Sequence, residues 1–178
     1  MAMKMPRALV RALLAFSITA CVTGTGAGAI AALGAQQLLA PTPAEEEASK
    51  YIAQYLLQNH YRKVPANDSL SQQVFDRFLE NLDPNRSYFT APEVANLRKD
   101  MGRQLDDEFV TGKTTSGFRI YNLFLQRARE KMSFMIAALK GPALQFSNHE
   151  TMMADRKDAP WPADRNELHD LWNKELKY

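Results

Sequence analysis

The chain has 178 residues, of which 46% are hydrophobic and 24% are charged, a composition typical of globular rather than disordered proteins. This length favours one domain with a short appendage and suffices for a hydrophobic core. The net charge of +2 becomes −1 without the three basic residues nearest the N-terminus, which leaves 19 basic against 20 acidic residues. Because no later run of Lys and Arg exceeds two residues, we expect no binding of nucleic acid.

Residues 1–40 have the pattern of an export segment. Basic residues precede an apolar run over residues 12–22, and an Ala-x-Ala cleavage pattern follows at residues 27–29. The basic residues are Lys4, Arg7 and Arg11. The segment is also long enough for an uncleaved membrane anchor, although Gly and Thr at 23–28 favour the cleaved signal peptide. Either form predicts export of the remaining chain to the periplasm.

The single cysteine of the chain, Cys21, lies inside this segment. Ile18-Thr19-Ala20-Cys21 matches a lipobox, which makes Cys21 a candidate lipid anchor. The apolar run continues beyond this cysteine, whereas the linker of a lipoprotein is generally polar. A small hydrophobic residue within a signal is therefore the favoured interpretation. One cysteine also predicts no intramolecular disulfide bond.

The Pro41-Thr42-Pro43 boundary precedes a helical region over residues 41–178. Thr42 to Glu45 form a capping-box pattern with proline at the first helical position, which predicts a helix to about His60. One face of this helix carries Ala48, Ile52, Tyr55 and Leu56.

A second helix is predicted after the Val64-Pro65 turn. Asp68 or Ser69 is expected to cap its start, and Asp83-Pro84 ends it because proline cannot continue a helix. Its apolar residues follow the helical period and form one stripe. They are Leu70, Val74, Phe75, Phe78, Leu79 and Leu82.

A third helix is predicted from the capping box that begins at Thr90 to the C-cap Gly112. Its apolar face consists of Val94, Leu97, Met101, Leu105 and Phe109. The acidic run at residues 106–108 raises the possibility of a calcium or carboxylate-pair site. Adjacent helical positions point about 100° apart and no glycine-bearing ligand loop follows, so we predict no such site.

Thr115 or Ser116 is expected to cap a fourth, long helix that runs to Lys140, where Gly141-Pro142 ends it. Its predicted buried stripe is Phe118, Tyr121, Leu125, Ala128, Met132, Met135, Ile136 and Leu139. Residues 144–162 are irregular, and Trp161, between two prolines, is expected to fix this loop onto the bundle. A last helix is predicted to start near Asp164 and to carry the apolar residues Leu168, Leu171, Trp172 and Leu176.

Together these elements predict an all-α fold of about five helices in an orthogonal or mixed bundle. The three histidines, His60, His149 and His169, lie on separate elements without a second ligand at metal-binding spacing. Nucleophile-elbow, phosphate-loop and dinucleotide-binding motifs are also missing from the sequence. We therefore expect no catalytic, cofactor-binding or metal-binding residue in this chain.

Two separated blocks carry a family resemblance. The first contains His60-Tyr61-Arg62, Phe75 to Leu79, and Leu82-Asp83-Pro84-Asn85-Arg86-Ser87-Tyr88-Phe89. The second contains Asp155 to Pro162, Glu167-Leu168 and Leu171-Trp172. In this order the blocks resemble the N-terminal region of bacterial tail-specific (carboxy-terminal processing) proteases, over about Ser49 to Tyr178.

The resemblance implies a PDZ-type domain and a protease core with a serine nucleophile activated by a lysine. Those parts would follow Tyr178, so no catalytic residue is carried over, and we expect this chain to be a truncated or split product that is inactive alone. It would be the non-catalytic N-terminal helical domain of a periplasmic protease that degrades proteins with apolar C-termini. In that role it would scaffold the core and help to bind substrates or an adaptor protein. The alternative is a stand-alone exported interaction module, with Cys21 as a candidate lipid anchor and membrane contact only through the N-terminal segment.

Overall fold

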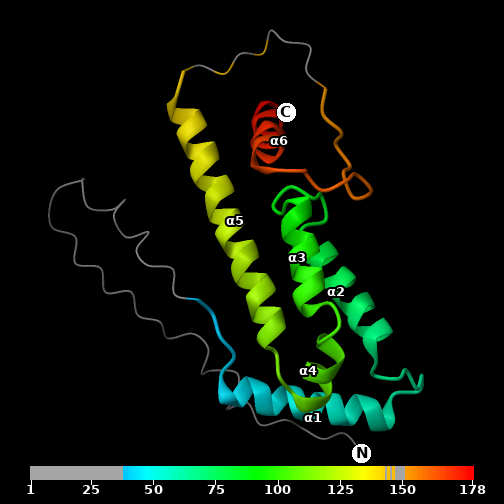
Figure 1. Ribbon diagram of the computed structural model, residues 1–178. Helices are drawn as coiled ribbons and strands as arrows, with labels where there is room; N and C mark the ends of the chain where they lie inside the picture. Colours follow the sequence, from blue (N-terminus) through cyan, green and yellow to red (C-terminus); the bar gives the residue numbers. More distant parts are fainter. Residues whose placement is uncertain (1–37, 143, 145, 147–150) are drawn as a thin grey trace, which may run out of the picture. The chain divides into compact units, whose positions relative to one another are not determined.

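The computed structural model describes residues 38–142, 144, 146 and 151–178 (Figure 1). The predictions for residues 1–37, Cys21 included, lie outside the described residues. Those described form six helices and no strand, which confirms the all-α prediction. The helices are α1 (Pro43–Asn59), α2 (Asp68–Leu82), α3 (Ala91–Met101), α4 (Leu105–Thr111), α5 (Thr115–Lys140) and α6 (Arg165–Lys177). None of these six combines the length and apolar character that a membrane-spanning helix needs.

Helix α1 begins at the predicted capping box. The Thr42 backbone N–H donates to Glu45 Oε2 over 2.7 Å, and the Glu45 N–H donates to Thr42 Oγ1 over 3.3 Å. The helix lies across one end of α2 and α5 and packs on α4 (Figure 1). Its single buried residue is Ala53. The apolar face identified in the sequence is exposed, and it consists of Ala48, Ile52, Tyr55 and Leu56.

Helix α2 differs from the prediction in its N-cap and in its buried line. Its N-cap is Asn67, whose side chain accepts the Leu70 N–H over 3.1 Å, so neither Asp68 nor Ser69 is the cap. The buried line is Ser71, Phe75 and Leu79, whereas Val74 is 46% exposed. Ser71 can be buried because its hydroxyl accepts the backbone N–H of Asp106 at 3.1 Å, where α4 packs on α2.

The third predicted helix is two helices, α3 and α4, which is why the described residues form six helices instead of about five. The chain turns at Gly102, whose N–H donates to the Arg98 carbonyl oxygen over 2.9 Å. A side-chain carbon at this glycine would lie 2.6 Å from the same oxygen, so the turn requires glycine. The Gln104 N–H closes the turn on the Met101 carbonyl oxygen.

The hydrophobic core lies where α2, α3 and α5 meet. It consists of Phe75, Leu79, Phe89, Val94, Leu97, Met101 and Ile120, with Trp161 and Phe124 half-buried against it. The prediction that Trp161 fixes the irregular loop is confirmed, because its ring lies 6.1 Å from that of Phe89. The Ala91 N–H donates to the Pro162 carbonyl oxygen over 2.8 Å. Asp164 caps α6 as expected.

The predicted buried stripe of α5 is wrong in the C-terminal half of the helix. Met132, Ile136 and Leu139 are 61%, 45% and 65% exposed. Helix α6 packs on a different line of α5, where Phe134 lies 5.4 Å from the Trp172 ring. The same line of α5 carries Arg127, which is buried. This line therefore does not appear apolar in the sequence.

Candidate functional site

The turn after α2 is organised by a buried carboxylate. Asp83 is 1% exposed, and its two oxygens accept the backbone N–H groups of Ser87, Tyr88 and Phe89 over 2.7, 2.9 and 3.1 Å. Arg86 within this turn has φ 51°, a left-handed conformation that is uncommon outside glycine. The carboxylate holds the backbone in a tight loop that returns the aromatic residues to the core.

Burial raises the pKa of the Asp83 carboxyl, while the three N–H groups and the charge of Lys131 act in the opposite direction. A raised carboxyl pKa is also a property of catalytic acids. Here both oxygens are occupied by backbone donors and the residue is almost fully buried. Asp83 therefore has a structural role, because its carboxylate accepts hydrogen bonds from buried backbone N–H groups.

The second sequence block docks on this turn. The Arg86 guanidinium donates to the Ala159 carbonyl oxygen and lies 5.5 Å from the centre of the Trp161 ring. The Trp172 indole N–H donates to the Ser87 carbonyl oxygen over 2.7 Å. We call this meeting of the Asp83–Phe89 turn with the 155–162 loop and Trp172 the junction. It brings together the two blocks that carry the family resemblance.

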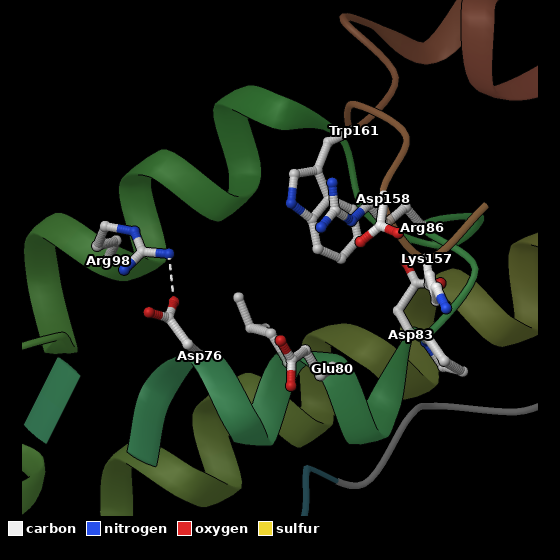
Figure 2. A pocket seen from close by; sticks show the side chains of 10 residues that line it. Asp76, Glu80, Asp83, Arg86, Arg98, Lys157, Asp158 and Trp161 are labelled. Atoms are coloured by element: carbon white, nitrogen blue, oxygen red, sulfur yellow. Dashed lines mark hydrogen bonds and ion pairs between the residues drawn. The ribbon is translucent and has the colours of Figure 1, made fainter. Parts of the chain in front are cut away.

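A hollow of about 470 Å³ opens beside the junction (Figure 2). Its lining residues are Asp76, Leu79, Glu80, Asp83, Pro84, Arg86, Arg98, Lys157, Asp158 and Trp161. Figure 2 shows Arg98 paired with Asp76 on one side, at 2.5 Å, and Arg86 beside Trp161 on the other. The three cations face four carboxylates, and no Ser, Cys or His lines the hollow. The lining of this hollow therefore holds no Ser–His or Cys–His pair of nucleophile and base.

An ion cluster joins α3, α5 and α6. Arg127, whose side chain is 8% exposed, donates from Nε to Glu93 Oε1 over 2.8 Å and pairs with Glu130 over 2.9 Å. Arg165 pairs with Glu130 from α6. Burial raises the pKa of Glu93, but the hydrogen bonds from Arg127 and Thr90 outweigh it and hold the pKa below its ordinary value. Such a cluster fixes the helices relative to one another.

Lys131 links this region to the junction. Its ammonium group donates to Ser87 Oγ over 3.0 Å, pairs with Glu175 of α6 over 2.7 Å and lies 4.5 Å from the Tyr88 ring centre. Neither Lys131 nor Arg127 is predicted from the sequence to make such contacts. The available signal was their spacing, because Ile120, Arg127, Lys131 and Phe134 recur at seven, four and three residues along one face of α5.

The histidines considered in the sequence stay apart where the structure describes them. His60 ends α1, His169 stacks 5.0 Å from Phe134, and His149 lies outside the described residues. In the acidic run, Asp106 is buried, Asp107 is exposed, and Glu108 accepts the Ser116 N–H over 2.9 Å. Within the described part of the chain, no three His, Cys, Asp or Glu side chains gather in a way that could hold a metal ion.

Comparison with known proteins finds similar sequences over most of the chain. The family model described as the tail specific protease N-terminal domain matches residues 52–178. The tail-specific protease of Haemophilus influenzae is 31% identical over 158 residues, and the match covers 84% of this chain but 22% of the relative. The chain therefore spans about a fifth of the length of that relative. Both sequence blocks of the junction lie within the matched residues.

Proposed function

Because this chain belongs to the tail-specific protease family, whose N-terminal domain it contains, we propose that it is a non-catalytic scaffold for the protease core. The core itself, a Ser/Lys protease with a PDZ-type domain, would lie outside these residues and would process exported proteins from apolar C-termini. The proposed location is the periplasm, reached through the export segment at residues 1–40. The helical domain would also help to bind substrates or an adaptor protein.

One observation carries the scaffold proposal: a regular apolar face that nothing in the described part of the chain covers. Met132, Ile136 and Leu139 lie four and three residues apart on α5, and all are exposed. We call these three residues the α5 face. Apolar side chains gathered on one surface in this way are typical of sites that pack against another protein surface. The ionisable groups of the junction and the ion cluster are, in contrast, used within the domain.

The proposal is tested in the full-length protease by placing charge on the α5 face. Ile136→Asp with Leu139→Asp should leave the fold of the domain intact, since both side chains are exposed, but should prevent packing on the core. We expect cleavage of a reporter protein with an apolar C-terminal tail to fall at least tenfold. Limited proteolysis should also release the helical domain more readily.

Ser133→Asp is the matched control, because Ser133 is exposed on the same helix and lies outside the α5 face. Full activity and unchanged proteolysis of the Ile136/Leu139 variant would overturn the scaffold role. Fractionation of cells that express the native gene tests the location separately. The periplasmic fraction should contain the protein, and its retention in the cytoplasm would contradict export.

A further inference from the structure

A second apolar surface lies at the corner where α1 leads into α2. It is a groove of about 490 Å³, within the size range of ligand pockets, and we call it the α1–α2 groove. Its apolar wall consists of Leu56, Leu57, Val64, Pro65, Leu70 and Phe109. Leu57 and Val64 are 38% and 46% exposed. The groove therefore presents apolar side chains that a bound partner would remove from water.

Three basic side chains border this apolar wall. They are His60, Arg62 and Lys63, and no acidic residue lines the groove with them. In the part of the chain that the structure describes, neither Arg62 nor Lys63 forms an ion pair. Lys63 donates one hydrogen bond, to the Gln58 carbonyl oxygen over 2.6 Å, which leaves two of its three donors. The charge of the rim is complementary to a carboxylate.

Part of the backbone around the groove is already hydrogen-bonded internally. The carbonyl oxygens of Leu56 and Arg62 accept the N–H groups of His60 and Val64 over 3.0 and 3.1 Å, and the Gln58 oxygen accepts Lys63. An extended peptide that binds by strand addition needs a free edge of backbone groups. These bonds interrupt such an edge at Leu56, Gln58 and Arg62, which favours an occupant that satisfies its own backbone, as a helix does.

From these three features we propose that the α1–α2 groove binds an amphipathic helix of a partner protein. The helix inserts Leu, Met or Phe side chains between α1 and the following loop, and an Asp or Glu beside its apolar face pairs with Arg62 and Lys63. This is the helix-in-groove mode of recognition, with charge selecting the partner. The inference rests on the proposed function, because it assigns the partner-binding role of the domain to one surface.

The test is fluorescence anisotropy with the full chain and a labelled 18-residue helical peptide that carries leucines on one face and two glutamates beside them. A second peptide replaces both glutamates by lysine. We expect the glutamate peptide to bind at least tenfold more tightly. Arg62→Glu with Lys63→Glu should reverse this preference, and Val64→Asn should weaken both peptides at least tenfold.

Arg129→Glu is the matched control, because Arg129 is exposed on α5, and it should bind like the unaltered chain. Circular dichroism on each variant separates lost binding from lost folding. Equal affinity for the two peptides, or no binding of either, overturns the inference. The inference is also overturned, in favour of a lipid ligand, if the chain binds vesicles rich in anionic lipid and this binding excludes the glutamate peptide.

The two proposals fail in different experiments. Loss of protease activity on charging the α5 face, combined with no peptide binding, would reject the α1–α2 groove and keep the scaffold role. In the opposite case, the chain binds the peptides charge-selectively, but charging the α5 face leaves protease activity unchanged. This result would reject the scaffold role and keep the groove as a partner site.

Discussion

Trp172 and Ser87 are joined by a hydrogen bond of 2.7 Å between the indole N–H and the backbone carbonyl oxygen, across 85 residues of sequence. Trp172 is fully buried and Ser87 is 3% exposed. The Ser87 hydroxyl accepts Lys131 of α5 as well. One short turn thus connects α2, α5 and α6, and the two blocks of family resemblance are held together at a point that is closed to solvent.

Removal of this hydrogen bond should destabilise the domain measurably. Trp172→Phe leaves the Ser87 carbonyl oxygen buried without its donor, which costs about 1–3 kcal/mol. Trp172→Ala adds a cavity and should cost about 3–5 kcal/mol. Urea unfolding followed by circular dichroism measures both values. Tyr178→Phe, at a position 84% exposed, is the control, and a Trp172→Phe variant as stable as this control would contradict the role of the bond.

Asp83 should be equally sensitive to substitution. Asp83→Ala leaves three N–H groups of the turn without their acceptor, and we expect a loss of about 2–3 kcal/mol in the free energy of unfolding. Asp158→Ala removes an exposed carboxylate from the same hollow and should change stability by less than about 0.5 kcal/mol. Equal effects of the two substitutions in urea unfolding would show that Asp83 does not organise the turn.

Several helix ends are predicted correctly from the sequence, although the N-caps of α2 and α5 are Asn67 and Thr114 instead of the predicted residues. The caps at Thr42 and Asp164 and the stop at Gly112 are all observed, because a cap depends on residues within one turn of helix. The position of Trp161 was also predictable, since prolines on both sides exclude it from a helix and its ring needs an apolar contact.

The buried faces of α2 and α5 were harder to predict because polar residues occupy them. Ser71, Arg127 and Lys131 lie on core-facing lines, the first two buried and the Lys131 side chain 13% exposed. A group distant in sequence satisfies each of them. In α1 and in the second half of α5, the period of the apolar residues marks a face that is exposed instead of buried. The junction was unpredictable for the same reason, since no local pattern pairs Trp172 with Ser87.

The ion cluster predicts a pH dependence of stability. The pKa of Glu93 is held below its ordinary value, so its contribution is complete at pH values above the ordinary glutamate pKa of about 4.3 and is lost as the pH falls through the depressed pKa. Glu93→Gln should therefore cost about 2–4 kcal/mol at pH 7, because Arg127 loses a buried partner, and much less at pH 3.

Urea unfolding of both proteins at pH 7, 5 and 3 measures this difference. Glu80→Gln is the control, because its pair with Arg77 is exposed and such pairs contribute little. A Glu93→Gln penalty that stays constant from pH 7 to pH 3 would show that the charge of Glu93 does not supply the stabilisation.

Two glycines should respond to alanine with opposite signs. Gly112 has φ +79°, and a side-chain carbon there would lie 2.5 Å from Lys50 Cβ on α1, so Gly112→Ala combines left-handed strain with a clash and should cost about 2–4 kcal/mol. Gly117 lies within α5 with nothing within 4 Å of such a carbon, so Gly117→Ala should stabilise the domain by about 0.5–1 kcal/mol. Thermal and urea unfolding of the two variants measure both changes. If Gly112→Ala proved as stable as Gly117→Ala, the close packing of α1 on the end of α4 would be wrong, because that contact leaves no room for a methyl group.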